Sequence, residues 1–195
     1  MEIQPQDQKA ILQLIERGVE GSAAKLAAIS RTDWQIRTTS FKAYATPGDY
    51  AELKAASQYF FGASCQAPGK MFLALFTSRS AAIITKAFLA GSGKQMEATV
   101  QMQEMAIAEV ANIVINAVSN SLADECGMAF ILSAPKSSRG ARADIIKAAF
   151  GDFAARGKIF SAYIHLSSSD LSTDCTLMLM LDDLIVNFIL NALDR

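Results

Sequence analysis

A chain of 195 residues that is 51% apolar and carries a formal net charge of −1 can bury a full core, as one domain or two half-sized ones. Its near-zero charge provides no basic field, which disfavours nucleic acid as a partner. The longest apolar runs, LMLML and LIVNFIL, are far shorter than the roughly 20 residues of a membrane span, which disfavours a membrane as well.

The amino terminus and the cysteines indicate a cytoplasmic protein without disulfides. MEIQPQDQKAIL lacks a basic segment followed by an apolar stretch and a cleavage site, so nothing in it directs export. Cys65, Cys126 and Cys175 are odd in number and widely spaced, without any CxxC pair. This spacing favours neither a disulfide framework nor a zinc site, and we expect three buried thiols.

The first half of the chain predicts the order helix, strand, helix, two strands, helix. Apolar residues recur at helical spacing near the amino terminus, and WQIRTTSFKAYA is rich in β-branched and aromatic residues. A TPGD turn signal then precedes a short helix. The predicted helices cover about 5–29, 49–57 and 78–90, and the predicted strands about 34–45, 58–65 and 70–77.

The second half predicts the same order of elements. Its closest resemblance to the first half is between CTLMLMLDDLIVNFILNAL and KMFLALFTSRSAAIITKAFL, each a strong strand followed by an apolar helix. The predicted helices cover about 98–123, 141–155 and 182–193, and the predicted strands 127–134, 159–166 and 175–181. The sequence GSGKQME, residues 91–97, is the expected join between the halves.

This order predicts one domain over residues 1–195, with repeat one at about 1–92 and repeat two at about 98–195. Loops this short favour antiparallel neighbours. We therefore expect an α/β chain of the α+β type, with a central, mostly antiparallel sheet covered by helices and two halves related by pseudo-twofold symmetry.

The long helix over 98–123 carries a polar pair on its outer face. Glu109 and Asn112 are three residues apart, so their side chains point the same way. An amide can donate to one partner while it accepts from a water, which suits a water-orienting residue. Asn116 and Asn120 share this side. The opposite, core-facing stripe is predicted to consist of Val100, Ile107, Ala111, Val114, Val118 and Leu122.

Three apolar residues lie beside this pair. Met102, Met105 and Ile113 share the outer face, and with Asn116 they form a candidate surface for docking another protein. The alternative is that they pack against another element of the same chain, as methionines at helical spacing often do. The sequence leaves both open.

The pattern ExxN, followed after 22 residues by Pro135, resembles the motif of the CheC and CheX phosphatases. These proteins remove phosphate from the chemotaxis response regulator CheY and its relatives. The order of predicted elements resembles theirs over nearly the whole chain. The family motif begins with Asp or Ser four residues before the Glu, where this chain has Met105.

The resemblance implies a phosphatase that acts on the aspartyl phosphate of a CheY-like receiver domain. Asn112 would position the attacking water and Glu109 would pair with a lysine of the partner. Pro135 would end a strand and shape the loop beside the helix. The chain would need no cofactor of its own, because the Mg²⁺ would be bound by the partner.

An alternative function accompanies this interpretation. A non-catalytic module of the same fold would bind a response regulator or another signalling protein through the same surface.

The first-half helix carries no second copy of the ExxN motif. It offers Glu16 before Val19 and Glu20 before Ala23, without an amide, so we expect a single site. Family members occur as monomers with two repeats or as dimers with a shared sheet, which leaves a homodimer open.

A weaker hydrolase pattern lies near the carboxyl terminus. His165, Ser167 and Ser169 would alternate on one face of a strand, followed by Asp170. No strand-to-helix elbow of the GxSxG type accompanies them, so a polar edge or strand face is the favoured explanation.

Overall fold

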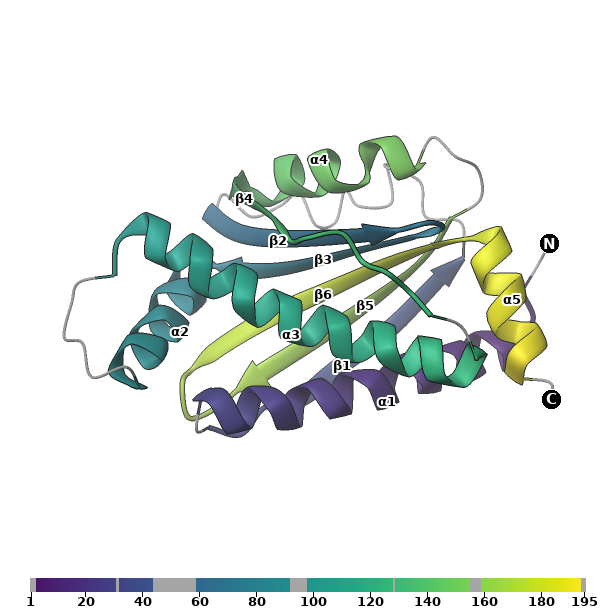
Figure 1. The fold of residues 1–195 in the computed structure, drawn as a ribbon, viewed down its shortest axis with the longest axis horizontal. Coiled ribbons are helices and arrows are strands. Elements are labelled where there is room, and N and C mark those ends of the chain that lie inside the picture. The colour runs from purple at the N-terminus through teal and green to yellow at the C-terminus, as the bar shows by residue number, and fades with distance from the viewer. Residues whose placement is uncertain are drawn as a thin grey trace.

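The computed structural model describes residues 3–30, 32–43, 59–91, 98–127, 129–154 and 159–193. Figure 1 shows the helices and strands that these residues form. The helices are α1 (Pro5–Ser30), α2 (Ser78–Gly91), α3 (Val100–Cys126), α4 (Arg142–Ala154) and α5 (Asp183–Leu193). The strands are β1 (Gln35–Ala43), β2 (Tyr59–Ala67), β3 (Lys70–Thr77), β4 (Lys136–Ala141), β5 (Ile159–Ser168) and β6 (Thr173–Asp182).

The described strands form one sheet in the order β1-β5-β6-β3-β2-β4. Every neighbouring pair in this sheet is antiparallel. The central pair is β3 with β6, in register from Lys70 opposite Leu181 to Leu75 opposite Thr176. The predicted fold class, an α+β chain with an antiparallel sheet covered by helices, is confirmed.

The two faces of the sheet bury separate hydrophobic clusters, because side chains alternate along each strand. On β3, Phe72 and Phe76 belong to the larger cluster, and Leu73 and Leu75 to the smaller one. Helices α1, α2, α3 and α5 complete the larger cluster, and α4 completes the smaller one. Helix α3 therefore belongs to the main core layer, and Figure 1 shows it crossing the sheet beside α1.

Most predicted elements within the described residues are confirmed, with boundaries shifted by a few positions. The predicted helix at 49–57 lies outside the described residues, as does the join after Gly91 up to residue 97. The strand order has an internal symmetry. When β1 is exchanged with β4, β2 with β5 and β3 with β6, the new order is the original order read from the opposite edge of the sheet. The two-repeat organisation itself stays a prediction.

The strand predicted at 127–134 is wrong. Strand β4 begins after Pro135, so this proline precedes a strand instead of ending one. Proline has no N–H to donate to a ladder. Two bonds replace the ladder just before it: Ser133 N donates to Gln66 O (2.8 Å), and Gln66 N donates to Ser133 Oγ (3.1 Å). Residues 129–134 of the predicted strand form an irregular segment that is bonded to the end of β2, with Ile131 87% exposed.

Helix α3 is long and apolar, although the longest uninterrupted apolar runs of the sequence are short. It has 27 residues and contains an 18-residue window apolar enough to cross a membrane. More than half of that window, 56%, is buried inside the fold, and Thr99 caps the helix by accepting from Met102 N (3.2 Å). These features are typical of the central helix of a folded domain.

The three cysteines are buried and free, as expected. Burial raises the pKa of the Cys65 thiol to about 11, and it also raises the pKa of the Cys126 and Cys175 thiols. A thiol in this environment is a poor nucleophile because the thiolate is scarce at neutral pH. The cysteines are therefore core residues.

Lys70 is a buried cation at the start of β3. Its side chain is 2% exposed, and its Nζ lies 3.2 Å from the centre of the Phe130 ring. Burial lowers the pKa of Lys70 to about 8, although the Asp182 carboxylate opposes the shift. The cation–π contact joins the β2–β3 turn to the segment that leads from α3 to β4.

We expect this lysine to make stability pH-dependent. Its pKa is about 8 in the folded chain against an ordinary 10.5, so the unfolded chain binds more protons between these values. The free energy of unfolding should therefore rise with pH across this window, and Lys70→Met should remove that rise. Urea unfolding of both proteins from pH 7.5 to 10.5 measures the difference. The Cys65 and Cys175 thiols act in the opposite direction and do not interact with Lys70, so their contributions cancel in the comparison. If the free energy of unfolding changed with pH in the same way in both proteins, Lys70 would not be the source of the pH dependence.

Candidate functional site

The rotation of α3 is set by its buried face. Ile107, Val114 and Val118 point into the main core, as predicted. Val100 does not: it is 47% exposed, because it is the first residue of the helix and the buried positions begin only at Ile107. Each larger aliphatic side chain buried here is worth about 1.5–3 kcal/mol, which fixes the outward direction of the opposite face.

Glu109 and Asn112 lie on that outward face. The Glu109 side chain is exposed and the Asn112 side chain is partly buried. Within the described part of the chain, the structure contains no hydrogen bond or ion pair to the Glu109 carboxylate. The Glu109 carboxylate can therefore contact a partner without first breaking a bond.

Asn116 lies one turn further along the helix and contacts Asn112. Asn116 Nδ2 donates to the backbone carbonyl oxygen of Asn112 (2.8 Å) and to its side-chain Oδ1 (2.7 Å). The spacing NIVIN permits this i,i+4 contact, but the sequence pattern placed Asn116 only on the candidate docking surface. The structure thus links two residues that were predicted to act separately.

The apolar neighbours differ in exposure. Met105 is 68% exposed and Met102 is partly buried. Ile113 is partly buried and packs against the main core, which matches the alternative that the sequence left open for it. The exposed apolar area on this face is therefore centred on Met105.

An ion pair connects this end of α3 to the edge strand. Arg139 Nε on β4 lies 3.3 Å from Glu104 Oε1 on α3. Both side chains are partly solvent-exposed, so the pair contributes about 0.2–1 kcal/mol. Glu104 directly precedes Met105 in α3. The ion pair therefore places two opposite charges near Met105 on this face.

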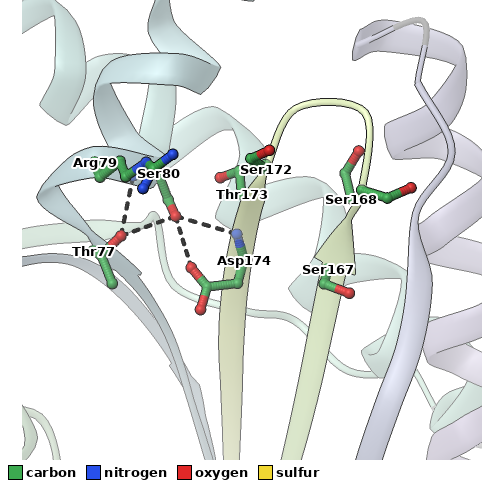
Figure 2. A pocket seen from close by; sticks show the side chains of 9 residues that line it. Thr77, Arg79, Ser80, Ser167, Ser168, Ser172, Thr173 and Asp174 are labelled. Carbon is green, nitrogen blue, oxygen red and sulfur yellow. Dashed lines mark hydrogen bonds between the residues drawn. The ribbon is translucent and has the colours of Figure 1, made fainter.

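A separate hydroxyl-rich pocket of about 430 Å³ lies where α2 begins, beside the turn between β5 and β6 (Figure 2). Ser80 Oγ donates to Asp174 Oδ1 (2.7 Å), and it accepts from Thr77 Oγ1 (2.9 Å) and from Asp174 N (3.2 Å). These bonds join α2 to β6, as the dashed lines in Figure 2 show. Thr77, Ser80 and Asp174 are thus satisfied by one another, which is typical of a structural network. The buried Thr173 Oγ1 in the lining of the same pocket has no hydrogen-bond partner among the described residues.

The hydrolase pattern near this pocket is not formed as predicted. Strand β5 ends at Ser168, so Ser169 and Asp170 lie in the turn and do not continue the alternation from His165. His165 Nε2 lies 4.0 Å from Asp174 Oδ2 across the sheet. In the part of the chain that the structure describes, no group of three or more His, Cys, Asp or Glu residues could hold a metal ion.

No family model matches the sequence, and no curated protein matches it. Solved structures match its fold. FliY from Thermotoga maritima has a TM-score of 0.73 at 14% identity, over 100% of this chain and 98% of that one. CheX from Desulfovibrio desulfuricans has a TM-score of 0.55 at 13% identity, over 87% and 99% of the two chains. This chain has a CheC/CheX-like fold.

The same fold occurs in a protein that forms a complex with another protein. A chain of the FliG–FliM complex from H. pylori has a TM-score of 0.64 at 9% identity, over 97% of this chain and 100% of that one. At such identities the CheC/CheX-like fold is established and the activity is not, since one fold hosts several functions.

Proposed function

We propose that this protein is a phosphatase for a phosphorylated CheY-like receiver domain, and that Glu109 and Asn112 are its active residues. The observation that carries the proposal is that both side chains face outward from one rigid core helix of a CheC/CheX-like fold. Met105 stands where the family motif has Asp or Ser, so the chain departs from that motif at one position of the same face.

Asn112 would act on the attacking water. Phosphoryl transfer needs little covalent chemistry from the protein and depends on positioning and electrostatics. An amide side chain can accept a hydrogen bond from water and donate to the phosphoryl oxygen, which holds the water in line with the bond that breaks. The aspartyl phosphate and the Mg²⁺ that neutralises its charge would belong to the receiver domain.

Glu109 would fix the docking. Its carboxylate is exposed and unoccupied in the described structure, so it can accept a charge-assisted bond from a lysine of the receiver. Met105 and Met102 would provide the adjacent apolar contact, with flexible thioether side chains that adapt to a partner surface. A receiver domain is a cytoplasmic protein, so we place this chain in the cytoplasm as well.

A second candidate is a non-catalytic interaction module. The substitution at Met105 favours it, since an apolar group there extends the docking area without adding a polar group to the active pair. The FliG–FliM complex shows that a protein of this fold can assemble with another protein. Under this alternative the receiver, or another signalling protein, would bind the α3 face without faster loss of phosphate.

A dephosphorylation time course separates the two candidates. The purified protein should accelerate phosphate loss from a phosphorylated receiver domain and show negligible hydrolysis of p-nitrophenyl phosphate, because the phosphoryl group and the metal come from the partner. A stable complex with an unchanged rate would favour the interaction module. Efficient hydrolysis of the small ester, unaffected by changes at Asn112, would contradict both candidates.

We expect Glu109→Gln to weaken docking more than turnover. An exposed charge pair is worth about 0.5–1 kcal/mol, so KM for the phosphorylated receiver should rise about 2- to 5-fold with kcat nearly unchanged. The effect should shrink at high salt because screening weakens the wild-type pair. Steady-state kinetics at two ionic strengths measures both quantities.

Asp124→Asn is the matched control, because it removes the same charge from an exposed position at the far end of α3. It should leave KM at the wild-type value. A large loss of kcat in Glu109→Gln with unchanged KM would mean that the carboxylate acts in the chemical step and would overturn the docking role.

A further inference from the structure

The orientation of the Asn112 amide is fixed by the backbone of its own helix. A backbone carbonyl oxygen can only accept a hydrogen bond, so the Asn116 atom 2.8 Å from Asn112 O must be its Nδ2. The same Nδ2 lies 2.7 Å from the Asn112 side chain, and the atom that faces this donor must be the acceptor Oδ1. Both amides therefore have one consistent orientation, with the –NH₂ group of Asn112 directed away from Asn116.

Without this bond the Asn112 amide would have no fixed rotation. The terminal torsion of asparagine is broad and roughly two-fold, so the oxygen and the nitrogen could exchange places at little cost. A donor that contacts Oδ1 removes that freedom, and it also polarises the amide so that its N–H groups become stronger donors. One lone pair of Oδ1 remains for a water.

We propose that Asn116 is a positioning residue, which holds the Asn112 amide with its donors outward before any partner arrives. The consequence for catalysis rests on the proposed function, whereas the positioning itself can be tested on the free protein. The competing explanation is that the contact only stabilises the helix, by the roughly 0.2–0.5 kcal/mol of an i,i+4 pair. The two explanations differ in what they predict for the Asn112 side chain.

The kinetic effect should fall on the chemical step. Asn116→Ala should lower kcat for receiver dephosphorylation on the order of 10-fold, the lower end of the roughly 10- to 100-fold loss that follows removal of residues that orient metal ligands. KM should stay within about 2-fold, because Glu109 and Met105 keep their exposed positions. A clearly raised KM with unchanged kcat would contradict the inference and would make Asn116 a docking residue.

Asn116→Asp gives the sharper comparison because it preserves size. A carboxylate cannot donate to Asn112 O or Oδ1, and it would attract the Asn112 –NH₂ group toward itself. The amide should then rotate so that Oδ1 faces outward, and kcat should fall at least as far as in Asn116→Ala. A wild-type kcat in Asn116→Asp would contradict the inference, because a side chain of the same size without the donor would then preserve the activity.

Side-chain amide NMR tests the positioning without any partner. The ¹⁵N order parameter of the Asn112 –NH₂ group, identified by its absence in Asn112→Ala, should be high in the wild type and should fall in Asn116→Ala. Asn120→Ala, at an exposed position further along α3, should leave it unchanged. An unchanged order parameter in Asn116→Ala would overturn the inference, whatever the activity. A lowered order parameter in a protein with no phosphatase activity would support the positioning and contradict the proposed function.

Discussion

Asn112→Ala should lower the rate of receiver dephosphorylation by about 10²–10³ while the protein stays as stable as the wild type. Removing one positioned hydrogen-bonding group from an active site commonly costs a factor of that order. Alanine has the higher helix propensity, by up to about 0.7 kcal/mol, and the Asn112 side chain is only partly buried. The Asn116 amide would also keep its bond to the backbone oxygen of residue 112.

The measurement pairs kcat with thermal unfolding. Asn116 is unsuitable as a control, because its amide contacts Asn112 directly. Asn120→Ala is suitable, since Asn120 is exposed on the same helix, and it should preserve both rate and stability. Full activity in Asn112→Ala would sink the catalytic assignment. A marked fall in the melting temperature would show instead that the amide is a structural group.

Gly18→Leu should give the largest loss of stability, because α1 and α3 approach closely at this glycine. A Cβ at position 18 would lie 2.9 Å from the Cα of Val118 and 3.0 Å from the Cβ of Ser121. The first of these neighbours is backbone, which cannot rotate away. Overpacking of this kind costs about 1–3 kcal/mol, and the melting temperature falls about 2–4 °C for each kcal/mol in a domain of this size.

Gly21→Leu, less than one turn further along α1, is the matched control. A Cβ at Gly21 would meet nothing within 4 Å, and the residue is exposed. Replacing a helical glycine there should raise stability by up to about 1 kcal/mol. Equal melting temperatures for the two variants would show that α1 and α3 are not packed as described, and the support for the outward face of α3 would then be lost.

The fold could be predicted well where burial determines the sequence pattern. Strands β3 and β6 are buried on both faces and therefore appear as continuous apolar runs, and α3 shows a clear helical stripe. Strand β4 could not be predicted in this way. It is an edge strand of sequence KSSRGA, mostly solvent-facing, and its pairing with β2 gives it no apolar signature.

The positions of the candidate site residues were predictable to a similar degree. Helical spacing alone placed Glu109 and Asn112 on one outward face, and the structure has them there. The bond from Asn116 to Asn112 could not be predicted, because the same i,i+4 spacing also fits two side chains that each point to solvent. Pro135 was placed at the wrong end of a strand because the apolar residues before it resemble a strand more closely than the polar ones after it.

The central claim is tested most directly by single-turnover dephosphorylation of a phosphorylated CheY-class receiver domain with this protein in excess. We expect phosphate loss well above the receiver's own rate with the wild type, and loss near the receiver's own rate with Asn112→Ala, although both proteins form the complex. Equal rates with the two proteins, or a wild-type complex that leaves the receiver's own rate unchanged, would contradict the account.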